Sequence, residues 1–336
     1  MEDRHILDIQ DLHVYFRVYE GVSYVLDGIY LHIARGERVG LVGETGCGKT
    51  VTMKTVMGML KSPPAIIRYD KVSLDGQDIL KMSPKELLRV KGTKISMIFQ
   101  DPMNALNPVF TVGEQLYDVI RFAQKRLDNE KNPSQKEIHD RGIAILKEVR
   151  LPDPERIMGN YPLELSGGMR QRVLIAMALV NEPSFLIADE PGTALDVTIQ
   201  DQILNLLKEL VENRGISVLL ISHNLGVVRE TTERAYIMYA GQIVETAPVD
   251  LLFENPVHPY TQGLLASVPS LTGGEIAEGI PGMVPDYTVA PSGCRFHPRC
   301  THSMSICSEK KPSLTMIEPD HYVACYLYTE QKEQNE

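Results

Sequence analysis

The sequence predicts an α/β fold: a mostly parallel sheet with an antiparallel β part, interrupted by an inserted helical subdomain. Three observations favour this fold. Apolar runs of strand length alternate with helical patterns over most of the chain, a glycine-rich turn joins one such run to a helix at 43–50, and residues 103–164 change to amphipathic helix patterns. Strands that alternate with helices are typical of a parallel sheet covered by helices.

The first hundred residues carry most of the strand patterns. Apolar and polar residues alternate over 6–16 and over 29–33, as expected of half-buried strands. A short apolar strand at 39–42 runs into the glycine-rich turn, and another apolar run covers 95–99. A strand around 72–74 meets Asp75-Gly76, which is a strong hairpin signal.

The rest of the chain is first helical and then mixed. Amphipathic helices are expected at 112–126 and 135–149, a helix after Ser166-Gly167-Gly168, a strand at 185–188, a helix after Thr198 and a strand at 217–221. After about Pro248 the pattern breaks down into Pro- and Gly-rich stretches, which indicates a small appended domain. We therefore divide the chain into a core (1–102 and 165–250), a helical subdomain (103–164, continuing into the next helix to about 180) and an extension (251–336).

Composition excludes several classes of protein. The chain has 336 residues and a formal net charge of −10, which argues against a nucleic-acid binder, because such a protein carries a basic footprint. No stretch approaches the ~18 consecutive apolar residues of a membrane-spanning helix, and the charged N-terminal segment does not resemble a secretory signal. We expect a cytoplasmic protein that reaches a membrane only through partner proteins.

Residues 43–50 read GETGCGKT and fit the pattern G-x-x-x-x-G-K-[ST] at every fixed position. The glycines allow backbone N–H groups to curl around phosphates, and the following helix N-terminus favours negative charge. Lys49 is expected to reach the β- and γ-phosphates of a nucleotide, and the Thr50 hydroxyl to ligate Mg²⁺. A glycine-rich turn is often only structural, but the strand before it, the helix after it and the Lys-Thr pair together favour binding. The candidate loop residues are Gly43, Glu44, Thr45, Gly46, Cys47, Gly48, Lys49 and Thr50.

An apolar strand at 185–188 ends in two carboxylates, Asp189 and Glu190. Asp189 is placed to hold Mg²⁺ through its water shell, and Glu190 to polarise an attacking water. Acidic residues often close strands, so the pair is a weak signal alone. It becomes stronger in a chain that also carries the phosphate loop.

The stretch 165–172 reads LSGGMRQR and begins a predicted helix. Ser166, Gly167 and Gly168 offer a hydroxyl and free N–H donors, which makes a second anion site, although an ordinary helix N-cap has the same composition. Its position about twenty residues before Asp189 favours the anion site. With this stretch the chain closely resembles the ABC ATPase family, whose signature is LSGGQ. Met169 departs from the signature at a position that is not hydrolytic.

The resemblance implies roles for further residues. Gln100 matches the Q-loop, where it would contact Mg²⁺ and sense the γ-phosphate together with the switch histidine, His223; Ala194-Leu195-Asp196 matches the D-loop. The family usually stacks adenine on an aromatic residue of the first strand, for which Phe16 is the candidate and Tyr19 and Tyr24 the alternatives. The resemblance also implies a sandwich dimer, in which Ser166, Gly167 and Gly168 of one subunit close over ATP bound by the other.

Two observations select a branch of the family. Only about 115 residues separate Thr50 from Leu165, with no sustained heptads, which excludes the DNA-maintenance kind, and a single cassette excludes the translation kind. Residues 255–261, 280–285 and 294–300 resemble the C-terminal extension of oligopeptide and dipeptide importer ATPases. The resemblance implies the ATP-binding and hydrolysing subunit of an ABC importer for di- or oligopeptides. A nickel importer of the same group and a non-transport ABC ATPase are the alternatives.

The same resemblance implies partners. It predicts two membrane-spanning permease subunits, a homologous second ATPase subunit in a heterodimer and, indirectly, an extracytoplasmic peptide-binding protein, with no nucleic acid. The chain would then lie at the cytoplasmic face of the cell membrane, as a peripheral subunit.

Four cysteines cluster in the extension, at Cys294, Cys300, Cys307 and Cys325. In a reducing cytosol such a cluster favours metal over disulfides. Zinc sites use pairs two to four residues apart, and these gaps are longer. Since some importers of this group carry a [4Fe–4S] cluster in the extension, we predict such a cluster, with Zn²⁺ or free thiols as alternatives. His297, His302 and His321 lie nearby in sequence as substitute ligands.

Overall fold

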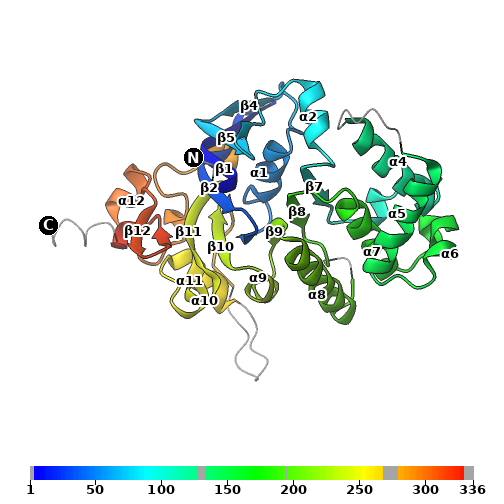
Figure 1. Cartoon of the computed structure of the whole chain (residues 1–336). Coiled ribbons are helices and arrows are strands. Elements are labelled where there is room, and N and C mark those ends of the chain that lie inside the picture. Colours follow the sequence, from blue (N-terminus) through cyan, green and yellow to red (C-terminus); the bar gives the residue numbers. More distant parts are fainter. Residues whose placement is uncertain (1–3, 127–132, 194, 268–278, 329–336) are drawn as a thin grey trace. The chain divides into compact units, whose positions relative to one another are not determined.

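The computed structural model describes residues 4–126, 133–193, 195–267 and 279–328. The chain divides into two compact units (Figure 1). The first comprises Met1–Ala34, Arg38–Leu80 and Ile221–Glu336, and the second comprises Arg35–Glu37 and Lys81–Leu220. The predicted division into core, helical subdomain and extension follows other boundaries and stays a prediction. The predicted D-loop includes Ala194, which lies outside the described residues.

The first unit contains an antiparallel sheet, in which β1 pairs with β2, β4 and β5, and β5 pairs with β6. Its strands are β1 (His5–Val18), β2 (Gly21–Ala34), β4 (Ala65–Arg68), β5 (Lys71–Leu74) and β6 (Gln77–Asp78). The buried side chains of β1 include Leu7, Ile9, Leu12 and Val14, which are at most 1% exposed. The hairpin predicted at Asp75-Gly76 is confirmed, because both residues have the positive φ values that a tight hairpin turn requires.

A second sheet of the first unit begins with the strand that leads into the phosphate loop. In this sheet β3 pairs with β10 in parallel. The pairs β10–β11, β11–β13 and β13–β12 are antiparallel. The strands are β3 (Arg38–Val42), β10 (Arg234–Tyr239), β11 (Gln242–Pro248), β12 (Thr315–Glu318) and β13 (His321–Val323). The predicted irregular extension therefore contributes two strands to this sheet. Both strands are too short to show a recognisable alternation in the sequence.

Helices of the first unit flank these strands, and α10 (Val249–Glu254) packs beside β11 (Figure 1). They are α1 (Lys49–Val56), α9 (Leu225–Thr231), α10 (Val249–Glu254), α11 (Pro259–Ala266), η2 (Tyr287–Val289), η3 (His297–Arg299) and α12 (Ser305–Glu309). No helix in the described ranges is long and apolar enough to cross a membrane.

The second unit is mainly helical around a parallel pair of buried strands, β7 (Ile95–Ile98) and β8 (Phe185–Asp189). Its helices are α2 (Pro84–Val90), α3 (Pro102–Ala105), α4 (Val112–Arg126), α5 (Gln135–Glu148), α6 (Pro154–Gly159), η1 (Pro162–Glu164), α7 (Gly167–Leu179) and α8 (Val197–Arg214). The last strand, β9 (Ser217–Ser222), contains the boundary between the units. The helices predicted at 112–126 and 135–149 are confirmed. A capping box of Ser134 and Glu137 starts α5, since each side chain binds the other residue's backbone N–H.

Candidate functional site

The phosphate loop of the first unit depends on glycine at three positions. A Cβ on Gly43 would overlap the backbone oxygen of Met238, so no larger residue fits there. Gly46 and Gly48 have φ values of 84° and 113°, which L side chains rarely adopt. Gly48 is also the N-cap of α1, so the left-handed turn directs the chain from the loop into the helix. The loop is thus built to expose backbone N–H groups at a helix N-terminus.

Lys49 lies inside this loop. Its ammonium donates to the backbone oxygens of Gly43 at 2.6 Å and Glu44 at 3.0 Å, and its side chain is buried. The Cys47 thiol lies 3.7 Å from the same nitrogen and is fully buried, and burial raises its pKa. This enclosed thiol therefore fills space inside the loop. The next residue, Thr50, is exposed.

The loop is also held from the β10–β11 hairpin. Gly241 donates its N–H to the Cys47 oxygen at 2.7 Å and accepts from Asp27 N–H at 2.9 Å. Gly241 has a φ of 78°, and a Cβ there would overlap the backbone oxygen of Val25. This close approach of three backbone segments was not foreseen, because the residues come from distant parts of the chain.

The second unit brings Gln100 and Glu190 together. The Gln100 amide donates to the Glu190 carboxylate at 2.8 Å, and the Thr193 hydroxyl donates to the same oxygen at 3.1 Å. Glu190 has a φ of 46°, an uncommon backbone conformation for a non-glycine residue. Strain of this kind is concentrated at functional sites. Asp189, at the end of β8, is buried.

The candidate second anion site is the start of α7. The Ser166 hydroxyl accepts from Met169 N–H at 3.3 Å, so Ser166 is the N-cap of this helix. A Cβ on Gly168 would come within 2.9 Å of Ile199 Cγ2 and one on Gly167 within 3.2 Å of Leu195 Cδ2. The glycines therefore permit close packing as well as exposing N–H groups, and Ser166 itself is exposed to solvent.

The remaining nucleotide-site candidates lie in the first unit. Phe16 is half-buried on β1, where it faces Ser23 of β2 and Ala65 of β4 in the strand register. Of its alternatives, Tyr19 is fully exposed and Tyr24 is 42% exposed. His223 is exposed between β9 and α9. The assigned roles of all these residues stay predictions.

The four cysteines of the extension line one small pocket of about 20 Å³, which also touches His258, His297 and His302. Burial raises the pKa of Cys294 and of Cys325 to about 11; a backbone hydrogen bond to each thiol acts in the opposite direction, and the neighbouring cysteines add to the rise. This volume is about enough for one water molecule. Among the residues that the structure describes, no group of three or more His, Cys, Asp or Glu side chains lies in a metal-binding arrangement. The structure therefore brings the predicted ligands together but does not support the predicted [4Fe–4S] cluster.

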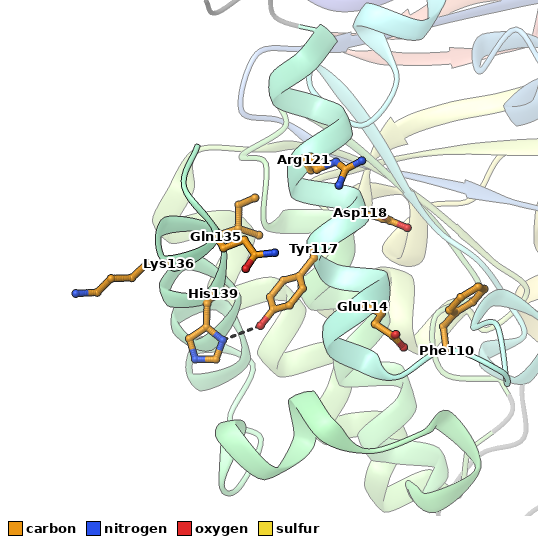
Figure 2. A pocket seen from close by; sticks show the side chains of 9 residues that line it. Phe110, Glu114, Tyr117, Asp118, Arg121, Gln135, Lys136 and His139 are labelled. Carbon is orange, nitrogen blue, oxygen red and sulfur yellow. Dashed lines mark hydrogen bonds between the residues drawn. The ribbon is translucent and has the colours of Figure 1, made fainter. Parts of the chain in front are cut away.

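A larger pocket, of about 570 Å³, lies between α4 and α5 in the second unit. Figure 2 shows Tyr117 of α4 and His139 of α5 directed at each other, with a hydrogen bond of 2.7 Å. Charged side chains of both signs, including Glu114, Asp118 and Arg121, line it along α4. None of the residues predicted for ATP chemistry contributes to this pocket.

Comparison with known families gives two matches. Residues 26–193 match the family described as ABC transporter, and residues 244–307 match the family described as oligopeptide/dipeptide transporter, C-terminal region. The first match includes the phosphate loop, Gln100, the start of α7 and the Asp189-Glu190 pair. The second includes three of the four clustered cysteines.

Curated relatives match over nearly the whole chain. An oligopeptide transport ATP-binding protein of Bacillus subtilis is 43% identical over 97% of this chain and 98% of its own length. A dipeptide transport ATP-binding protein of the same organism is 43% identical over 98% and 96%. A probable peptide ABC transporter ATP-binding protein of Sinorhizobium fredii is 44% identical over 97% and 96%.

Solved structures match the fold. The dimeric post-hydrolysis structure of the ATP-binding cassette MJ0796, bound to ADP and Pi, has a TM-score of 0.63 and 28% identity, covering 72% of this chain and 98% of that one. A cassette from Clostridium perfringens, part of an ABC transporter complex, has a TM-score of 0.59 and 27% identity, covering 75% and 92%. The described chain therefore has the ATP-binding cassette fold, with mixed sheets and helices.

Proposed function

Because this chain belongs to the ABC transporter family, we propose that it binds and hydrolyses ATP to power the import of di- or oligopeptides through membrane-spanning partners. The observation that carries this proposal is the phosphate loop, in which the Lys49 ammonium lies within a turn of glycines at the start of α1. Peptides are favoured as cargo because the relatives named for peptide transport match 97–98% of this chain at 43–44% identity.

ATP would bind with its phosphates in the loop 43–50. The backbone N–H groups there donate to phosphate oxygens, and the α1 N-terminus adds a favourable dipole. The Lys49 ammonium exchanges its two backbone acceptors for phosphate oxygens. Thr50, Gln100 and Asp189 would hold Mg²⁺, which neutralises charge on the phosphates. Phe16 would stack on the adenine.

Glu190 would act on the attacking water. Its carboxylate is held by the Gln100 amide and the Thr193 hydroxyl, so its orientation is set before a substrate arrives. A carboxylate held in this way can accept a hydrogen bond from water and align it with the γ-phosphate. His223 would contact the γ-phosphate. In a closed dimer, Ser166, Gly167 and Gly168 of a second subunit would donate to the same phosphate.

Replacement of two residues tests ATP chemistry. Glu190→Gln keeps the shape of the side chain but not the base, so turnover should fall by about 10²–10⁴-fold while ATP stays bound and the subunits stay dimeric. Lys49→Ala should instead lose ATP binding, because the phosphates lose their cation. Turnover, ATP binding and size-exclusion chromatography separate the two results.

Each variant has a control at a residue of the same type that lies outside the candidate site. Lys54→Ala removes an exposed lysine of α1 and should bind ATP normally. Glu155→Gln changes an exposed carboxylate of α6 and should leave turnover unchanged. Continued hydrolysis by Glu190→Gln would refute its role, and normal ATP binding by Lys49→Ala would refute the phosphate-loop assignment.

We further propose that two membrane-spanning permease subunits hold this chain at the cytoplasmic face of the membrane. A homologous ATPase subunit would complete a heterodimer, and an extracytoplasmic binding protein would deliver the peptide. Within this chain, the exposed apolar side chains of the second unit are the candidate positions for the permease contact. Met103 is 51%, Val109 70%, Phe110 48% and Leu163 65% exposed.

Charge placed on this apolar set tests the permease contact. Val109→Asp should lower the ATPase activity stimulated by the reconstituted permease without changing the activity of the isolated chain. Met316→Asp, at an exposed apolar position of β12, is the control and should keep full stimulation. Equal stimulation of both variants would exclude Val109 from the contact.

For the cysteine pocket we propose a structural metal centre, a [4Fe–4S] cluster with Zn²⁺ as the alternative. The support is the donor set: Cys294, Cys300, Cys307 and Cys325 line one pocket, and four thiolates can hold either metal group. A bound metal would supply cross-links between segments of the extension, not redox chemistry for transport.

Metal analysis of protein purified without oxygen distinguishes the alternatives. Broad absorption near ~400 nm with about four irons per chain indicates the cluster, and one zinc without colour indicates the ion. Cys307→Ser should lower the metal content, whereas Cys47→Ser should not. Wild-type protein without iron or zinc would refute the proposal.

A further inference from the structure

Three side chains of residues 258–300 contact the phosphate loop, although they lie more than 200 positions further along the chain. The Tyr260 hydroxyl accepts from Glu44 N–H at 3.0 Å. The Tyr287 hydroxyl donates to the Gly46 oxygen at 2.7 Å. Arg299 forms an ion pair with the Glu44 carboxylate, at 2.9 Å and 3.3 Å to its two oxygens. All of these residues belong to the first unit.

The Arg299 guanidinium has further hydrogen-bond acceptors outside the loop. Besides Glu44, its guanidinium donates to the backbone oxygens of Pro281 at 2.8 Å and Ile280 at 2.9 Å, and to the Tyr239 hydroxyl at 3.4 Å. All five N–H donors of the planar group are thus used, and its side chain is only 7% exposed. Lysine cannot reproduce this arrangement, because its ammonium lacks the planar fork that meets both oxygens of a carboxylate.

Tyr260, one of the two tyrosines that contact the loop, is itself fixed by packing. Tyr260 is fully buried and packs against Tyr239 and Phe296, with ring centroids 4.7 Å and 5.4 Å apart. Burial raises the pKa of Tyr260 and of Tyr287, so both hydroxyls stay neutral at ordinary pH. Side chains fixed in this way can hold a flexible glycine loop in one conformation.

The geometry matters because of what the loop binds. Its N–H groups must converge on phosphate oxygens, and the two positive-φ glycines leave the free loop many other conformations. Glu44 adds a negative charge directly beside the site for a polyanion. Arg299 neutralises that charge and fixes the residue, while the tyrosines fix the backbone at Glu44 and Gly46.

We propose that Arg299, Tyr260 and Tyr287 are positioning residues for the ATP phosphates, so that the C-terminal extension sets the ATP affinity of this chain. The inference rests on the proposed ATP site and adds residues to it that do not touch the nucleotide. It assigns to the extension a role in the cassette itself, independent of any metal in the cysteine pocket.

ATP binding by the full chain and steady-state ATPase activity test the proposal. Arg299→Gln should raise the Kd for ATP, and with it KM, by about tenfold, since the partly buried negative charge of Glu44 is left unpaired beside the phosphates. The value of kcat at saturating ATP should change less than about twofold, because bound ATP restores the loop. Arg299→Lys should recover only part of the affinity.

Two further variants separate positioning from general stability. Tyr287→Phe removes one hydroxyl and should raise the Kd about threefold, the loss of one modest hydrogen bond. Lys311→Gln is the matched control: this extension lysine also pairs with a carboxylate of the cassette, Asp27 at 3.4 Å, but outside the loop. Its Kd should equal that of the wild type.

The Kd values and the melting temperatures of these variants separate the possible outcomes. A raised Kd in Arg299→Gln and Tyr287→Phe, with Lys311→Gln unchanged, supports the proposal. A lower melting temperature with unchanged Kd in both loop variants would show a purely structural role and overturn it. Wild-type protein that binds no ATP would instead overturn the proposed function, and this inference with it.

Discussion

The most buried carboxylate of the first unit offers a sharp test of how the C-terminal residues are attached. Glu245 of β11 is fully buried and accepts three hydrogen bonds. The donors are Val257 N–H at 3.0 Å, His258 N–H at 2.9 Å and His321 Nε2 at 2.8 Å. One side chain therefore joins β11 to the start of α11 and to β13.

Glu245→Ala leaves these three donors without an acceptor. Each buried group that loses its hydrogen bond costs about 1–3 kcal/mol, and relief from burying a carboxylate offsets part of the sum. We expect the free energy of unfolding to fall by about 3–5 kcal/mol, which lowers the melting temperature by roughly 5–15 °C for a chain of this size. Glu245→Gln should lose about half as much, because its amide oxygen still accepts.

Thermal unfolding and amide hydrogen exchange measure the effect. Ala324 N–H donates to the Val244 oxygen at 2.8 Å, so its exchange reports whether β13 stays on β11. Glu318→Ala, at an exposed position of β12, is the control and should melt within about 1 °C of the wild type. If Glu245→Ala behaves like this control, Glu245 does not attach the C-terminal residues and the reasoning fails.

Two other predictions concern the candidate site. Gly241→Ala should lower the free energy of unfolding by about 2–4 kcal/mol and weaken ATP binding, because a Cβ would overlap the Val25 backbone and separate Gly241 from Cys47. The control is Gly215→Ala, which is also at a positive φ but has open space around its Cβ, so it measures the backbone effect alone. Equal losses of stability in the two variants would contradict the predicted overlap with Val25. Gln100→Ala should lower kcat about tenfold, since Glu190 loses one of its orienting donors; single-turnover hydrolysis at the wild-type rate would contradict it.

Helices and turns could be predicted from the sequence where they depend on residues close together in the chain. The helix at 112–126 has the predicted bounds, and the hairpin at Asp75-Gly76 lies where the dipeptide indicated. Both depend on residues a few positions apart, whose periodicity or turn chemistry can be recognised without a partner. The candidate ATP residues were found in the same way, because the phosphate loop is one continuous segment.

The C-terminal third shows where sequence patterns stop being sufficient. The helices α10 and α11 and the strands β12 and β13 are three to eight residues long, which is too short for a clear period. The sequence did single out the cysteines and the Pro-Gly-rich segments. It carried no signal that Arg299 or Tyr260 would meet the phosphate loop, since nothing near either residue specifies a partner so far away.

The sequence alone determined the cassette family, the phosphate loop, the Asp189-Glu190 pair and the clustering of cysteines, because each is encoded by neighbouring residues. Only the tertiary structure decided that Gln100 donates a hydrogen bond to Glu190, that Glu245 of β11 accepts one from His321, and that Arg299 of the extension pairs with Glu44. Those contacts join residues 76 to 255 positions apart. They form because packing of the sheets and aromatic side chains brings their backbones within hydrogen-bonding distance, and no short-range pattern records that packing.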